Sequence, residues 1–185
     1  MRRNRLMTAA VTAAAAVGIA LTASIATAAF AAQAVPSRTG LFSTWHGAQS
    51  AAGFSLMKPT RTYGLARAGR IIVSRCDISR KKGTKRLVIA AYGSTPNHNL
   101  TLSQNNSGGQ CAIISASKNL GRYRVNGTWA KLVGDCGRAG LPRCSSRKIF
   151  LFLTWRKNGN YYQASSYGER PSVVVGFARG LVRVG

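Results

Sequence analysis

The sequence predicts an α+β domain in which an antiparallel sheet carries one helix near each end of the chain. Apolar residues recur at helical spacing between positions 41 and 52 and again between 174 and 181. Between these segments, short apolar or alternating runs are separated by turn-forming residues, which is typical of strands. Two Asn-Gly dipeptides, at 126–127 and 158–159, lie between such runs and indicate tight hairpins.

The first helix is predicted over residues 44–52. Ser43 is its expected cap and Gly53 its expected end, and its inner face carries Leu41, Trp45, Ala48 and Ala52. Strands are predicted next at 70–77, 86–92, 99–104 and 111–116, followed by hairpins at 122–133 and 149–167. The second helix follows Pro171, because four apolar residues recur there at helical spacing, namely Val174, Phe177, Ala178 and Leu181.

The Asn-Gly turns also predict which residues face each other, because a two-residue turn fixes the register of a hairpin. In the first hairpin Arg124 is opposite Trp129, and Arg122 is opposite Lys131. That face is basic, whereas the opposite face is expected to join the core through Tyr123, Val125, Ala130 and Leu132. In the second hairpin the core face pairs Trp155 with Tyr162 and Leu153 with Ala164, and the reverse face is mixed, with Phe150, Phe152, Arg156 and Tyr161.

The amino-terminal segment has the pattern of a secretory signal peptide. Basic residues at positions 2, 3 and 5 precede an Ala-rich, uncharged run that extends to Arg38 and contains small residues two positions apart. We therefore expect cleavage near Ala31, which leaves residues 32–185 as one secreted, extracellular domain. Two alternatives remain open: export by the twin-arginine route, and retention of the uncharged run as a membrane anchor.

Charge is the most unusual feature of the composition. The chain has 27 Lys and Arg against 3 Asp and Glu, a formal net charge of +24, yet 45% of its residues are hydrophobic. That hydrophobic fraction favours a folded domain over a disordered polycation. The carboxylates are Asp77, Asp135 and Glu169, which are far apart in sequence, so we expect no carboxylate-rich metal site and no cofactor.

The four cysteines are Cys76, Cys111, Cys136 and Cys144, and all follow the predicted leader. An even number of cysteines in an exported chain predicts two disulfides. Four cysteines allow three pairings, of which we favour Cys76 with Cys111 and Cys136 with Cys144. Zinc is the competing hypothesis, but the chain contains no C-x-x-C, and neither His46 nor His98 lies near a cysteine in sequence.

Short motifs are spread across residues 32–185: Ala51-Ala52-Gly53-Phe54, Pro59-Thr60 with Gly64-Leu65, Tyr92 leading to Leu100-Thr101-Leu102-Ser103-Gln104, Val125-Asn126-Gly127 with Ala130, and Trp155, Gly159, Tyr162 and Ala178 with Leu181. Through these motifs the chain resembles a domain of unknown function found in secreted and membrane-proximal proteins of Gram-positive bacteria. That family is similar in fold to the half-barrels of periplasmic lipoprotein carriers. The resemblance implies a curved sheet with helices in its concavity, and it implies no catalytic residues. This chain departs from the family in its positive charge and its cysteines.

Two groups of residues are candidates for binding anionic polymers. One is an expected hairpin tip with five cations in seven residues: Arg80, Lys81, Lys82, Lys85 and Arg86. The other is the basic hairpin face, with Arg122, Arg124, Trp129 and Lys131. Such groups attract envelope polymers such as teichoic acids, acidic polysaccharides or nucleic acid. The simpler interpretations are a solvated loop for the tip and a cross-strand cation–π pair for the face.

The leading hypothesis is therefore a secreted, non-catalytic binding module. One alternative is a carrier or sensor that holds a hydrophobic ligand in the concave face implied by the resemblance. A remote alternative is a polyanion-cleaving enzyme with Glu169 as base, a histidine as acid and an arginine as phosphate clamp. We expect instead that Glu169 pairs with a neighbouring arginine, that His46 caps or lines the first helix and that His98 belongs to a turn. The oligomeric state stays open, and so does the question of whether the basic parts of the chain lie on one common face.

Overall fold

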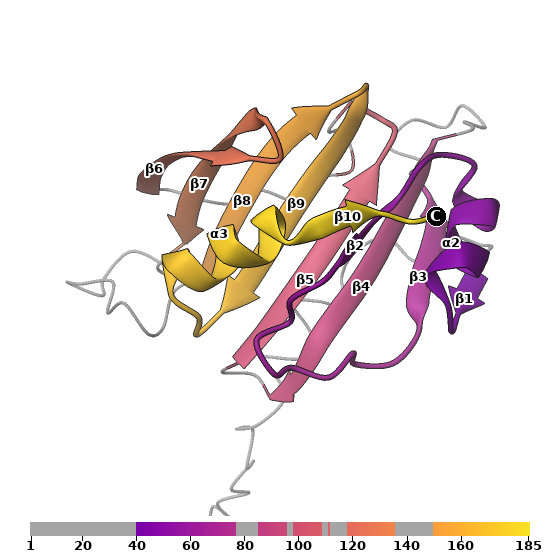
Figure 1. Ribbon diagram of the computed structural model, residues 1–185, viewed down its shortest axis with the longest axis horizontal. Helices are drawn as coiled ribbons and strands as arrows, with labels where there is room; N and C mark the ends of the chain where they lie inside the picture. Colours follow the sequence, from indigo (N-terminus) through magenta and orange to yellow (C-terminus); the bar gives the residue numbers. More distant parts are fainter. Residues whose placement is uncertain (1–39, 77–84, 96–97, 109–110, 112–117, 136–149) are drawn as a thin grey trace, which may run out of the picture. The chain divides into compact units, whose positions relative to one another are not determined.

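The main element is an antiparallel sheet of eight strands in the order β1-β3-β4-β5-β9-β8-β7-β6 (Figure 1). The computed structural model describes residues 40–76, 85–95, 98–108, 111, 118–135 and 150–185, all within one structural unit. In these ranges the strands of the sheet are β1 (Gly40–Phe42), β3 (Ile71–Arg75), β4 (Arg86–Thr95), β5 (His98–Asn105), β6 (Lys118–Val125), β7 (Thr128–Asp135), β8 (Phe150–Lys157) and β9 (Asn160–Tyr167). The predicted strand 111–116 lies outside the described residues except for Cys111.

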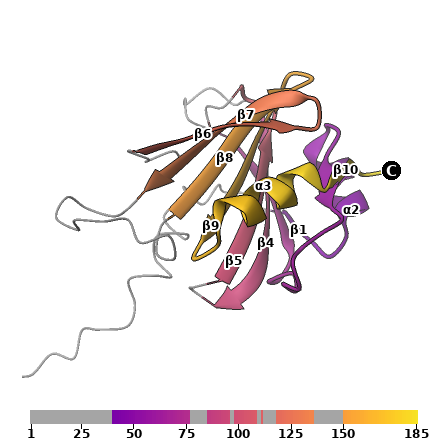
Figure 2. The ribbon, with the colours of Figure 1, turned by 60° about the vertical axis from the view of Figure 1, so that its left-hand side comes forward.

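One face of the sheet is covered by the remaining elements, as Figures 1 and 2 show. These elements are α2 (Trp45–Ala52), α3 (Pro171–Arg179) and a two-stranded ribbon of β2 (Met57–Pro59) and β10 (Leu181–Arg183). The fold class is α+β with helices on an antiparallel sheet, which confirms the prediction. The short strands β1, β2 and β10 were not predicted, because three residues are too few to establish an alternating pattern.

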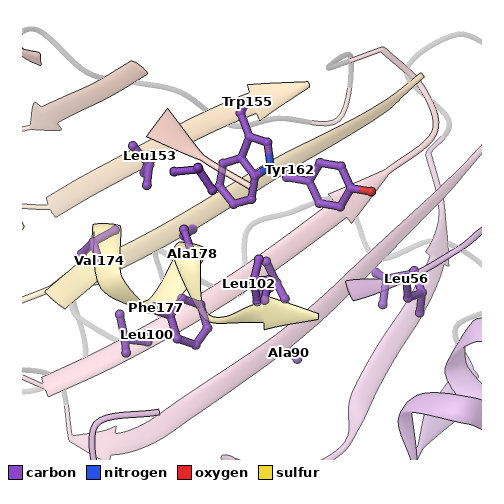
Figure 3. Packing of buried hydrophobic residues seen from close by; sticks show 14 of the residues in the cluster. Leu56, Ala90, Leu100, Leu102, Leu153, Trp155, Tyr162, Val174, Phe177 and Ala178 are labelled. Atoms are coloured by element: carbon purple, nitrogen blue, oxygen red, sulfur yellow. The ribbon is translucent and has the colours of Figure 1, made fainter. Parts of the chain in front are cut away.

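The core lies between this face and α3. Phe177, Val174 and Ala178 of the helix are all fully buried, and Figure 3 shows them over side chains of β5, β8 and β9 that include Leu100, Leu102, Leu153 and Tyr162. The ring of Phe177 meets that of Tyr92 edge to face, with centroids 5.7 Å apart. Trp155 and Tyr162 stack at 5.4 Å. The helical spacing in the sequence therefore marks the residues that α3 buries.

Two helix boundaries differ from the prediction. Thr44, not Ser43, caps α2: its backbone is extended, and its Oγ1 accepts a hydrogen bond from the Gly47 N–H at 3.1 Å. At the other end of the chain, Leu181 belongs to β10 and not to the helix, because Gly180 ends α3. Leu181 is still buried, so its spacing correctly indicated a core position but not its secondary structure.

Both Asn-Gly turns confirm the predicted hairpins. Asn126 and Gly127 have φ angles of 48° and 83°, and the second turn has 50° and 76°. These positive angles suit the twist of the flanking strands. The register is the predicted one: Arg124 pairs with Trp129 and Arg122 with Lys131 in the first hairpin, and Trp155 pairs with Tyr162 and Leu153 with Ala164 in the second.

The β2–β10 ribbon is attached to the sheet by a buried glutamine. Gln104 of β5 is fully buried. Its Oε1 accepts from the Met57 N–H, and its Nε2 donates to the Met57 carbonyl, both at 2.7 Å. A buried amide that satisfies a strand edge in this way avoids the cost of unpaired polar groups.

Tyr92 provides a pH-dependent prediction for this core. Burial raises the pKa of Tyr92 to about 12, although a hydrogen bond with Trp45 and the charge of Arg67 act in the opposite direction. Its ordinary pKa is 10.0, so the folded state holds the phenolic proton more tightly than the unfolded state does. The free energy of unfolding should therefore fall by about 2 to 3 kcal/mol as pH rises from about 10 to about 12.

Urea denaturation at several pH values between about 9 and about 12 measures this effect. The variant Tyr92→Phe lacks the ionisable hydroxyl, so its stability should decline less over the same range. An equal decline in both proteins would show that other groups are responsible.

Candidate polyanion-binding face

The β6–β7 hairpin presents its cations on the face of the sheet opposite α3. The side chains of Arg122, Arg124 and Lys131 are exposed, and Trp129 is 49% exposed. Their neighbours along the strands, Val125, Ala130 and Leu132, point the other way and are buried in the core. The alternation therefore separates a basic surface from an apolar one within a single hairpin.

Trp129 is in contact with two guanidinium groups. The Cζ atom of Arg124 lies 4.5 Å from the centroid of the indole ring, and that of Arg122 lies 5.3 Å away. Both distances are within the range of a cation–π interaction. This confirms the cross-strand pair as a structural feature, and it also concentrates two like charges beside one exposed aromatic ring.

Arg156 extends this surface from the neighbouring strand. Lys131 pairs with Thr154 in the β7–β8 ladder, so Arg156 stands opposite position 129. The Thr128 hydroxyl donates to the Arg156 carbonyl at 3.3 Å, and the Arg156 guanidinium donates to the Gly108 carbonyl. Arg156 is exposed. We call the resulting surface the basic face, with members Arg122, Arg124, Trp129, Lys131 and Arg156.

The hairpin that carries the basic face is anchored to the rest of the fold at its turn. The Asn126 side-chain amide donates to the Ala178 carbonyl at 3.2 Å, and the Lys157 ammonium donates to the Asn126 carbonyl at 2.8 Å. The Arg179 Nε donates to the Arg124 carbonyl at 3.0 Å. Because these bonds join the hairpin to α3 and β8, the cations have fixed backbone positions.

The predicted basic tip is only partly described. Arg80, Lys81 and Lys82 lie outside the described residues, whereas Lys85 is exposed and Arg86 begins β4. Three strands, β5, β9 and β8, separate β4 from β7, so about 19 Å lies between them. Arg86 also lies on the same face of β4 as Val88, which is the helix-covered side of the sheet. The structure therefore does not bring Arg86 to the basic face.

One predicted disulfide is present. Cys76 and Cys111 are bonded, with Cα atoms 5.8 Å apart. This confirms the first favoured pair and indicates an oxidising, non-cytoplasmic environment, while Cys136 and Cys144 lie outside the described residues.

Within the described part of the chain, no group of His, Cys, Asp and Glu could hold a metal ion. No helix there is long and apolar enough to cross a membrane.

Glu169 pairs with a histidine and not with the expected arginine. Its Oε1 lies 3.2 Å from Nδ1 of His98, whose side chain is 66% exposed. The ladder explains this contact: Asn99 pairs with Tyr167, so the start of β5 meets the residues that follow β9. His98 is the first residue of β5, not a turn residue. His46 lies within α2, and its Nδ1 is 3.3 Å from the Gly185 carbonyl.

Comparisons with family models, curated proteins and solved structures return no match for this chain. The resemblance to a family of secreted Gram-positive domains therefore stays a prediction, and the functional proposal rests on the residues themselves.

Proposed function

We propose that the protein is a secreted, non-catalytic module that binds anionic polymers through the basic face. The observation that carries this proposal is the exposed Trp129 with two guanidiniums at 4.5 and 5.3 Å, flanked by two further cations. Like charges gathered in this way repel one another, and a polymer with repeated phosphates, sulfates or carboxylates relieves that repulsion. Association then releases counterions and depends strongly on salt.

The partners that fit are envelope polymers such as teichoic acids, acidic polysaccharides and nucleic acid. Their common feature is a closely spaced row of anions, which the basic face meets without reading a sequence. The leader pattern supports a location outside the cytoplasm, where envelope polymers are found, and the net charge of +24 suits anionic partners. The oxidised Cys76–Cys111 pair is consistent with that location.

Replacing Trp129 by alanine tests the proposed surface. Because the ring is half exposed, its loss should lower the free energy of unfolding by about 1 to 2 kcal/mol, well below the cost of truncating a core Trp. Binding to heparin or duplex DNA should weaken, because Arg122 and Arg124 lose the ring that orders them. Chemical denaturation and a fluorescence binding titration measure the two effects.

Trp155→Ala is the matched control, since Trp155 is only 4% exposed. This variant should lose about 3 to 5 kcal/mol, the usual cost of truncating a core aromatic residue. A comparable destabilisation in Trp129→Ala would show that the basic face is buried in the functional protein and would contradict the proposal.

The carrier alternative is less well supported by the core. The side of the sheet that would hold a hydrophobic ligand is packed with side chains of α3, including Phe177 and Val174 (Figure 3). A ligand there would have to displace fully buried residues. Such a displacement costs the packing that holds the helix to the sheet.

The contact between Glu169 and His98 favours polyanion cleavage as a second candidate function. A carboxylate that orients an imidazole supports proton transfer. However, the two side chains are hydrogen-bonded directly to each other, so they do not act as a separate general acid and general base on opposite sides of a substrate. The only other histidine lies in α2. Release of soluble nucleotides from RNA by the purified protein, abolished in His98→Ala, would establish cleavage.

A further inference from the structure

A cleft of about 210 Å³ lies where β3 ends and β4 begins, beside the last turn of α2. Its apolar lining comes from Phe42, Ala51 and Val73. Arg75, the last residue of β3, and Arg86, the first residue of β4, also line it. The cleft therefore combines an apolar wall with two permanently charged side chains, and it is separate from the basic face.

The two arginines stand directly opposite each other. Arg75 pairs with Arg86 in the β3–β4 ladder, in the same alternating set as the pair of Val73 and Val88. Directly opposed residues have Cβ atoms about 4.5 to 5.5 Å apart, and like charges in such positions are destabilising. The Arg86 guanidinium donates to the Lys85 carbonyl at 3.4 Å, and the carboxylate of Glu169 is paired with His98.

The backbone on both sides of this pair is held in place. The Cys76 N–H donates to the Lys85 carbonyl at 3.1 Å, and the disulfide to Cys111 follows Arg75 immediately. The Arg86 N–H donates to Oδ1 of Asn106 at 2.7 Å. Because the backbones of both strand ends are held, an anion that binds here has to order only the two arginine side chains.

We propose that this cleft binds a small organic carboxylate, with the anion between Arg75 and Arg86 and its apolar group against Phe42, Ala51 and Val73. Arginine pairs well with carboxylates because its planar donors match the two oxygens. An engineered apolar cavity of about 150 Å³ holds one benzene molecule, so a cleft of about 210 Å³ accommodates one ring with its carboxylate. It lies below the roughly 300 to 1,000 Å³ of sites for larger ligands.

Titration of the purified protein with benzoate, followed by calorimetry or NMR, tests this proposal. Benzoate should bind at least about tenfold more tightly than benzyl alcohol, which lacks the charge, and than acetate, which lacks the ring. Arg75→Gln and Arg86→Gln should each weaken benzoate binding by at least about tenfold. Arg70→Gln is the matched control, because Arg70 is exposed and does not line the cleft, and it should bind benzoate as the wild type does.

Ala51→Leu provides a test that leaves the charges intact. Ala51 is exposed at its helix surface yet lines the cleft, so a larger side chain there should fill the apolar part and weaken benzoate binding without unfolding the protein. Two outcomes would overturn the proposal: unchanged benzoate binding in both arginine variants, or inorganic phosphate and acetate binding as tightly as benzoate. The second outcome would mean that the arginines hold any anion and that the apolar wall selects nothing.

Discussion

A variant in which Arg122, Arg124, Lys131 and Arg156 are all replaced by glutamine should bind duplex DNA roughly a thousandfold more weakly than the wild type at about 0.15 M salt. Each cation that contacts a phosphate contributes about 0.9 to the slope of log affinity against log salt, so four such contacts contribute about 3.6. The slope should therefore become flatter by about 3 to 4. Fluorescence anisotropy titrations at several salt concentrations measure both quantities.

The matched control removes the same number of charges elsewhere. Lys58, Arg61, Arg70 and Arg183 are exposed and do not belong to the basic face, and their replacement by glutamine lowers the net charge equally. This control should retain most of the wild-type affinity and slope, because binding depends on local charge density more than on total charge. Equal losses in the two variants would contradict the assignment of binding to the basic face.

Removal of the Cys76–Cys111 disulfide should lower the free energy of unfolding by about 4 kcal/mol. The bond joins residues 35 positions apart, and a cross-link of that span restricts the unfolded chain by about this amount in the chain-entropy model. The double variant Cys76→Ser, Cys111→Ser avoids a leftover thiol. For a chain of this size the melting temperature should fall by about 8 to 16 °C.

Chemical denaturation of the oxidised wild type and of the double variant measures this effect directly. Reduction of the wild type should lower its stability at least as far, since it opens the same bond. A loss below about 1 kcal/mol in the double variant would show that the closed loop is already restricted in the unfolded chain.

Local sequence determined the parts of this fold that depend on neighbouring residues. The Asn-Gly turns predicted both hairpins and their registers, because the positive φ angles of Asn126 and Asn158 require no distant partner. The contrast between exposed Trp129 and buried Ala130 followed from the alternation of side chains along a strand. Arg122, Arg124 and Lys131 could therefore be assigned to one surface before the fold was known.

Tertiary structure alone decided which of these surfaces meet. Arg156 joins Trp129 only because β8 pairs with β7, and His98 contacts Glu169, 71 residues away, only because β5 pairs with β9. The opposition of Arg75 and Arg86 likewise depends on the pairing of β3 with β4. Strand order is determined by burial summed over the whole sheet, and no short segment carries that information. The sequence thus specified the two faces of the hairpin strands β6 to β9, and the packing of all the strands decided the neighbours of each face.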